Sequence, residues 1–245
     1  DFQQILDFVE ELHEEYLLYN NNIIPRSSSK NINDVSIVDT DKIRETIEYI
    51  TSQPQPAQRT DEWYEFRNSL LSASSLWKAL GSQSQVNSLI YEKCKAFNTE
   101  YERMSYGTST PMHWGVKYEP VTIMIYEDLY KTKVGEFGCI RHPTYDFIGA
   151  SPDGISSKST LDYKFNPKLG YMLEIKCPVT RTIETSGKIV GEICPFYYYC
   201  QVQQQLACCE LDVCDFWQCK FTEYKSKHDY LADDCQKCII TELNC

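Results

Sequence analysis

Apolar residues recur at helical spacing near the start of the chain and at strand spacing in its centre. In residues 1–20 they fall at every third or fourth position with acids between them, which predicts an amphipathic helix. TDKIRETIEYI, residues 40–50, repeats the pattern and predicts a second helix opened by a Thr or Asp cap. TSQPQPAQRT then holds two prolines and no apolar partner, as a linker does. We therefore expect an acidic helical extension and linker over residues 1–58 and a main domain over residues 59–245.

Further helices are predicted at the start and middle of the main domain. RTDEWYEFRNSLLSASSLWKALG, residues 59–81, predicts two helices separated by a short break at residues 72–75. WGVKYEPVTIMIYEDLYK predicts another helix, and the i, i+4, i+8 spacing of Val121, Ile125 and Leu129 marks its expected apolar stripe.

The period then changes to that of strands. VGEFGCIRHPTYDFIGASPDGIS and YMLEIKCPV are short β-like runs separated by turn residues. PFYYYCQVQQQLACC returns to a helical pattern, and VCDFWQCKFTEY predicts a last strand. Helices, then strands, then a helix and a strand predict an α/β (α+β) fold with a mixed central sheet flanked by helices.

Composition indicates a globular intracellular protein. A chain of 245 residues with 42% hydrophobic residues can bury one substantial core. No run approaches the roughly eighteen apolar residues of a membrane span, and the N-terminus is acidic where a signal peptide is basic. Twelve cysteines in a chain with its own core favour reduced thiols. The net charge of −11 argues against nucleic acid at first sight, but residues 1–50 carry 11 acids and 4 bases and so account for most of it.

A Pro-Asp-Gly turn in GASPDGI and the strand LEIKCP carry the candidate chemistry. Strand alternation places Glu174 and Lys176 on one face and Ile175 on the other. With Asp153 beside them, two carboxylates and an ammonium would converge, and close carboxylates need a cation such as Mg²⁺ or Mn²⁺. The lysine can then orient a water or help to deprotonate it for attack on a phosphodiester. The bland alternative is a surface turn followed by an edge strand with a solvated ion pair.

Pro152-Asp153 and Glu174-Ile175-Lys176 resemble the signature of the PD-(D/E)xK nuclease superfamily. Further stretches narrow the resemblance to the lambda-type alkaline exonucleases and YqaJ-like viral recombinases, from about Trp63 to Trp217. These stretches, in chain order, are EWYEFRNSLLSAS, WGVKYEPVTIMIY, GASPDGI, LEIKCP and PFYYYCQVQQQLACC. The resemblance implies a restriction-endonuclease-like core. It leaves residues 1–58 uncovered.

The resemblance also implies roles for individual residues. Two Mg²⁺ (or Mn²⁺) ions would be bound by Glu119, Asp153, Glu174 and the backbone carbonyl of Ile175. Lys176 would position the attacking water, and Gln201 would lie at the rim of the site. The implied 5′-phosphate pocket consists of Arg67, Ser74 and Ser151. A guanidinium with two hydroxyls suits an anion. Because the motif reads SAS, either Ser72 or Ser74 can face the phosphate.

The implied activity is 5′→3′ degradation of one strand of linear double-stranded DNA to 5′-mononucleotides. The resemblance also suggests a large DNA virus, action in host cytoplasm or nucleus, DNA ends as ligand, a single-strand annealing protein as partner and possible homo-oligomers. Two alternatives stay open. One is an endonuclease of the same superfamily, which needs no 5′-phosphate. The other is a non-catalytic DNA-end-binding protein, which the presence of the acids and the lysine disfavours.

The C-terminal cysteines allow one further metal hypothesis. Cys235, Cys238 and Cys245 follow a C-x2-C-x6-C spacing at the C-terminal side. Some relatives in the wider superfamily bind an iron–sulfur cluster through three such cysteines and one upstream cysteine, and Cys94 could be the upstream ligand here. With twelve cysteines, one C-x2-C is expected by chance. We therefore expect no iron–sulfur cluster.

Overall fold

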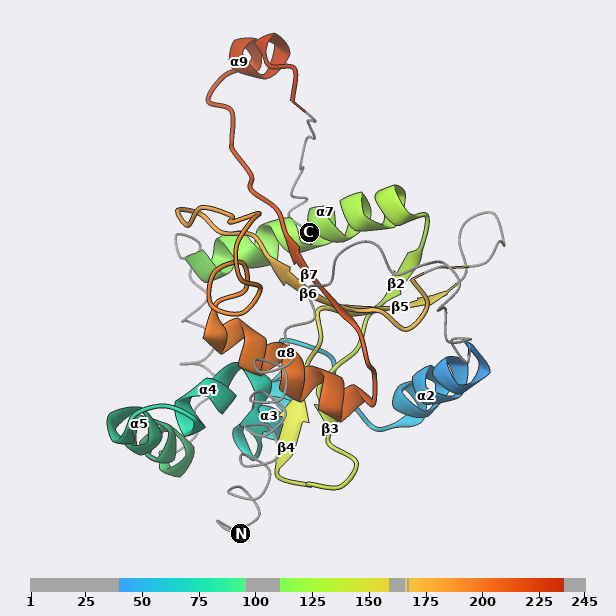
Figure 1. Ribbon diagram of the computed structural model, residues 1–245, viewed down its shortest axis with the longest axis vertical. Coiled ribbons are helices and arrows are strands. Elements are labelled where there is room, and N and C mark those ends of the chain that lie inside the picture. The colour runs from blue at the N-terminus through green and yellow to red at the C-terminus, as the bar shows by residue number, and fades with distance from the viewer. Residues whose placement is uncertain (1–39, 96–110, 159–165, 167, 236–245) are drawn as a thin grey trace.

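The computed structural model of the protein describes residues 40–95, 111–158, 166 and 168–235 (Figure 1). The helices are α2 (Thr40–Ser52), α3 (Asp61–Asn68), the 3₁₀ turn η2 (Ala73–Ser75), α4 (Leu76–Ala79), α5 (Gln83–Cys94), α7 (Pro111–Tyr130), α8 (Phe196–Cys209) and α9 (Lys227–Ala232). The strands are β1 (Leu71–Ser72), β2 (Lys133–Gly135), β3 (Ile140–Arg141), β4 (Ile148–Ala150), β5 (Gly154–Lys158), β6 (Met172–Lys176) and β7 (Cys214–Gln218).

The strands form two mixed sheets instead of the single central sheet expected. One has the order β1-β4-β3, with β1 and β4 parallel and β3 antiparallel to β4. The other has the order β2-β5-β6-β7, antiparallel except for the parallel pair β6 and β7. Since β4 ends at Ala150 and β5 begins at Gly154, the connection Ser151-Pro152-Asp153 carries the chain from one sheet to the other. The Pro-Asp turn is therefore the junction of the two sheets.

The two faces of β6 pack against different helices, as strand alternation predicts. Leu173 and Ile175 lie in a buried cluster with Tyr118 and Tyr126 of α7. Met172, on the other face, lies in a cluster that includes residues of α8. Figure 1 shows α7 and α8 on opposite sides of the four-stranded sheet. Glu174, which shares a face with Met172, is thereby directed toward α8.

Helix α8 also contacts the three-stranded sheet. The amide Nε2 of Gln204 donates to the carbonyl oxygens of Leu71, at 2.8 Å, and Gly149, at 2.9 Å. Its side chain is fully buried, and Cys200 and Cys208 of the same helix pack in a cluster with Ile148. Because α8 is bonded to one sheet and packed on the other, it holds the junction between them.

The mixed α/β fold flanked by helices is confirmed, and so are a helix at α2 and the helix and strand at α8 and β7. The stripe expected for α7 is wrong. Tyr118, Thr122 and Tyr126 are buried, whereas Leu129 is 60% exposed. The buried stripe lies one residue along the helix, about 100° around its axis, because aromatic rings rather than aliphatic residues fill the space over β6. Helices α5 and α9 were not predicted, and the break expected at residues 72–75 contains the end of β1 and η2.

The predicted extension is described only in part. Residues 1–39 lie outside the described residues, and with them the first predicted helix. Helix α2 buries Ile47 and Ile50 in the cluster that contains Met172. Gln58 donates to the carbonyl of Phe137 at 3.0 Å. The boundary near residue 58 stays a prediction, and residues 40–58 contact the main domain. No helix in the described ranges has the length and apolar character of a membrane span.

Candidate active site

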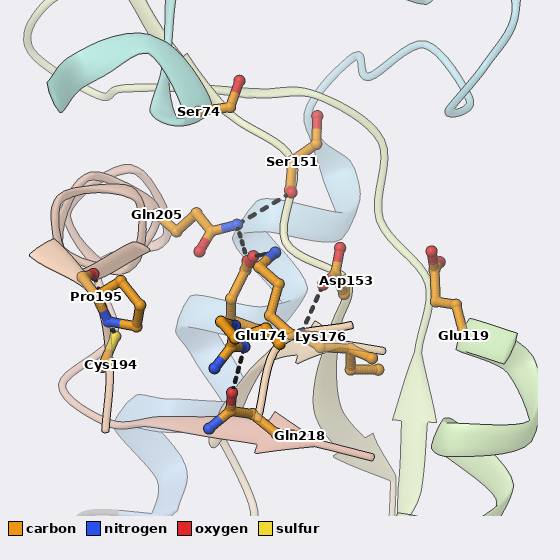
Figure 2. Close-up of polar contacts among 12 residues, drawn as sticks. Ser74, Glu119, Ser151, Asp153, Glu174, Lys176, Cys194, Pro195, Gln205 and Gln218 are labelled. Atoms are coloured by element: carbon orange, nitrogen blue, oxygen red, sulfur yellow. Dashed lines mark hydrogen bonds and ion pairs between the residues drawn. The ribbon is translucent and has the colours of Figure 1, made fainter. Parts of the chain in front are cut away.

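The predicted turn and strand meet at a buried carboxylate (Figure 2). Glu174 is fully buried in β6 and forms an ion pair with Lys176. Gln205 of α8 donates from Nε2 to Glu174 Oε2 at 2.7 Å. Asp153 Oδ2 accepts the backbone N–H of Ile175 at 2.7 Å. One bond therefore ties the Ser-Pro-Asp junction to β6, and another ties β6 to α8.

Glu119 reaches the same place from α7. In Figure 2, Asp153 lies between Glu174 and Glu119. Burial and the negative charges of Glu174 and Glu119 raise the pKa of Asp153 well above its usual value. Burial also raises the pKa of Glu119, against the opposing effect of Arg59, whose Nη2 lies 2.9 Å from Glu119 Oε2. Three carboxylates thus act on one another, with a positive side chain paired to two of them.

Lys176 is held as a cation. Burial works to lower the pKa of its ammonium, but the carboxylates of Glu174 and Asp153 outweigh it and raise that pKa above its usual value. The ammonium also lies 4.6 Å from the ring centre of Tyr198. These interactions favour the positively charged form of Lys176 beside the carboxylates.

The carboxylates were tested as a metal site. Within the described ranges, no group of three His, Cys, Asp or Glu side chains is close enough together to hold a metal ion. Arg59 pairs with Glu119, Lys176 pairs with Glu174, and Asp153 Oδ2 accepts the Ile175 N–H. The carboxylate oxygens therefore do not converge on one point. Their chemistry nevertheless fits a hard divalent cation, because buried carboxylates that raise one another's pKa are stabilised by added positive charge.

A second polar cluster lies on the other side of the junction. Arg67 of α3 donates from Nη2 to Ser74 Oγ at 3.0 Å, and its guanidinium lies 4.3 Å from the ring centre of Trp63. Trp63 Nε1 donates to Ser151 Oγ at 3.1 Å. Ser74 is exposed, whereas Ser72 is buried. The structure therefore brings Arg67 to Ser74 directly and to Ser151 through an indole, and it favours Ser74 over Ser72 as the exposed hydroxyl.

Comparison with known proteins identifies the family. Residues 62–212 match the YqaJ-like viral recombinase domain. The chain belongs to this family.

One curated viral protein and two solved structures are similar to parts of the chain. The chain is 35% identical over 189 residues to protein R354 of Acanthamoeba polyphaga mimivirus, covering 76% of this chain and 33% of that protein. It thus spans about a third of the length of this curated relative. The alkaline exonuclease LHK-Exo of Laribacter hongkongensis matches at 27% identity with a TM-score of 0.48, over 66% of this chain and 74% of that one. Its complex with dAMP matches at 27% identity with a TM-score of 0.46, over 65% and 73%.

The family match spans every residue that the sequence proposed for the site, and the structure gathers most of them. Glu119, Asp153, Glu174 and Lys176 lie together, as predicted, although their functional roles stay predictions. Gln201 is different. It is half-buried one turn before Gln205, and no hydrogen bond from it to the carboxylates is formed among the described residues. The glutamine that reaches the site of this YqaJ-like domain is Gln205.

Sequence reasoning missed two further side chains of the site. Gln205 lies four residues after Gln201, so both share a face of α8, and the glutamine run itself was a signal for either residue. Arg59 carried no signal, because nothing in its local pattern indicates a contact with a helix sixty residues away. The iron–sulfur hypothesis falls partly outside the described residues, where Cys238 and Cys245 lie. Cys94 and Cys235 are exposed.

Proposed function

We propose that this YqaJ-like domain is a divalent-metal-dependent exodeoxyribonuclease. It degrades one strand of linear double-stranded DNA in the 5′→3′ direction to 5′-mononucleotides. The observation that carries the proposal is the junction between the sheets. Asp153 there faces Glu174, while Ser151, two residues earlier, belongs to the cluster of Arg67 and Ser74. One short turn thus joins a group of acids with a lysine to a group suited to a terminal phosphate.

Each side chain has a task in this proposal. Glu119, Asp153, Glu174 and the carbonyl of Ile175 would hold Mg²⁺ or Mn²⁺, two ions in all. The bound cation supplies charge neutralisation at the phosphate and acidifies water for the attack. Lys176, kept positive by its neighbours, orients the water and the phosphate oxygens. Gln205 holds the Glu174 carboxylate through its 2.7 Å bond.

The Arg67 cluster would select the end of the strand. A guanidinium binds phosphate through two parallel hydrogen bonds, and the exposed Ser74 hydroxyl adds a donor without charge. Trp63 holds both sides of the cluster, because its ring stacks under Arg67 and its Nε1 bonds Ser151. A 5′-phosphorylated end would then be positioned with its next phosphodiester at the carboxylates.

The setting of the activity is proposed from the viral relative. We expect the protein to act on viral DNA inside an infected cell, in cytoplasm or nucleus, for recombination, repair or replication. The single strands it leaves would suit a single-strand annealing protein as partner, and homo-oligomers would keep the enzyme on its substrate.

The test compares linear duplexes with a 5′-phosphate or a 5′-hydroxyl on one strand, in Mg²⁺, with end-labelled and internally labelled DNA. We expect mononucleotides from the phosphorylated strand, none from Glu174→Ala, and wild-type rates from Glu184→Ala, an exposed acid outside the site. Cleavage of closed circular DNA, or equal rates at both ends, would instead show an endonuclease. DNA binding without any cleavage would show an end-binding protein.

A further inference from the structure

Arg59 contacts the candidate metal site from outside the family match. It immediately precedes Thr60, the N-cap of α3, and its Nη2 lies 2.9 Å from Oε2 of Glu119, sixty residues further along the chain. The Glu119 side chain is 24% exposed and that of Arg59 is 41% exposed. The pair is thus half-covered, and solvent reaches it from the arginine side.

The backbone of Arg59 adopts an unusual conformation. Its φ is 68°, in the left-handed region that residues with a side chain rarely occupy. Neighbouring contacts hold this turn. Gln58 donates to the carbonyl of Pro152 at 3.1 Å, and Thr60 Oγ1 donates to that of Ala57 at 2.8 Å. These bonds hold the backbone of the turn, whereas the guanidinium of Arg59 stays half-exposed at the end of a long side chain.

The guanidinium has spare hydrogen-bonding capacity. It carries five N–H donors, and within the described part of the chain its recorded side-chain bond is the one to Glu119. Its partner Glu119 is one of the carboxylates whose negative charge raises the pKa of Asp153.

We propose that Arg59 is an exchangeable counter-ion of Glu119, which neutralises this carboxylate in the metal-free protein and leaves it when a divalent cation binds. The inference rests on the proposed function, because it takes Glu119 as a metal ligand. The arginine and the cation compete for the same oxygens, so Arg59 sets the cation concentration at which the site fills. Arg59 is a positioning residue in this role.

The competition predicts a definite change in cation affinity. Half-exposed ion pairs are weak, so loss of the arginine should tighten binding roughly twofold to fivefold. The measurement is isothermal titration of Mn²⁺ into the full chain without DNA, for wild type, Arg59→Ala and Arg59→Lys. We expect tighter binding for Arg59→Ala and a near-wild-type value for Arg59→Lys, which keeps the charge. Thermal melts recorded on the same samples verify that each variant is folded.

Two control variants separate direct competition from general electrostatics. Arg44 pairs with Asp41 at 2.7 Å on the surface of α2, so Arg44→Ala should leave the affinity unchanged. Arg181 lies near the site, since its charge acts on Tyr198, and it bonds Gln218 at 2.6 Å instead of a carboxylate. Arg181→Ala should therefore tighten binding less than Arg59→Ala does. An equal gain from both variants would overturn the proposal.

A double-mutant cycle tests whether Arg59 acts through Glu119. In a Glu119→Gln background, Arg59→Ala should no longer change the affinity that remains. Persistence of the full effect there, or equal or weaker binding by Arg59→Ala alone, would refute the counter-ion role. If wild type itself binds no Mn²⁺, the metal-dependent function fails, and the counter-ion role fails with it. Wild-type binding without an effect of Arg59→Ala would refute the counter-ion role alone.

Discussion

Gln205→Leu tests whether α8 holds the central carboxylate. The wild-type side chain is fully buried, and its Nε2 donates to Glu174 at 2.7 Å and to the carbonyl of Ser151 at 3.2 Å. A hydrogen bond to a charged group contributes about 1.5–3 kcal/mol and one to a carbonyl about 1 kcal/mol. Gln205 Oε1 is buried with no hydrogen-bond partner among the described residues, and its removal returns roughly 1 kcal/mol. We expect a net loss of about 1.5–3 kcal/mol in the free energy of unfolding.

The assay is urea unfolding followed by circular dichroism in the absence of divalent cations. Thermal melts should show a midpoint lower by roughly 3–12 °C, given about 2–4 °C per kcal/mol for a domain of this size. Gln203→Leu is the matched control. It lies on the same helix, is half-buried and forms no side-chain hydrogen bond to the described residues, so its change should stay within about 0.5 kcal/mol.

Nuclease turnover provides the second readout. Without the hydrogen bond from Gln205, the Glu174 carboxylate is held only by its ion pair with Lys176 and can shift with that side chain. Turnover should therefore fall while DNA binding is kept. A Gln205→Leu protein as stable and as active as wild type would refute the argument, and so would an equal loss of stability in Gln203→Leu.

Three further outcomes follow from the site and the core. Asp153→Asn should abolish cleavage and yet stabilise the metal-free protein, because it removes one of three mutually repelling carboxylates, and thermal melts would show a higher midpoint. The raised pKa of Asp153 means that the folded state holds its proton to higher pH than the unfolded state does. Metal-free wild type should therefore gain stability as pH falls from neutral through that raised pKa, and Asp153→Asn should flatten this slope in a pH series of melts; an unchanged slope would contradict the assignment. Arg67→Ala should lower the kcat/KM ratio between 5′-phosphorylated and 5′-hydroxyl duplexes about tenfold to a hundredfold, with a smaller drop for Arg67→Lys. Burial raises the pKa of Cys200 and of Cys209 to about 12, so peptide mapping after alkylation at pH 8 should find both unlabelled and the exposed Cys94 labelled.

Asp153, Glu174 and Lys176 could be located from the sequence because their placement follows from local rules, whereas Glu119 was located only through the family resemblance. Alternation along β6 puts Glu174 and Lys176 on one face, and the Pro-Asp turn precedes the strand that pairs with β6. Gln205 could not be separated from Gln201 in this way. The run CQVQQQL offers several phases around the helix axis, and only the packing of α8 on both sheets decides which glutamine points at Glu174.

The role of Arg59 and the three-stranded sheet β1-β4-β3 could not be predicted from local sequence patterns for a related reason. β1 and β3 each span two residues, which is too short for any period to show. The contact of Arg59 with Glu119 depends on a left-handed residue and on how α7 crosses β6, both of which tertiary packing determines.

The charges at the junction show how a fold can keep such a site without metal. Glu119 and Glu174 each have a cationic partner, Arg59 and Lys176, and Asp153 has the Ile175 N–H. The positive charge of Lys176 works against the rise in the pKa of Asp153, but burial and the charges of the two glutamates outweigh it. The two cationic side chains differ in how freely they can move away from their carboxylates. Lys176 lies two residues from Glu174 on the same rigid strand and stays in the site, whereas Arg59 is half-exposed on a loop and can withdraw. In the proposed function, the cation that orients the water is therefore fixed by the sheet, and the cation that a metal ion would displace lies on a half-exposed loop.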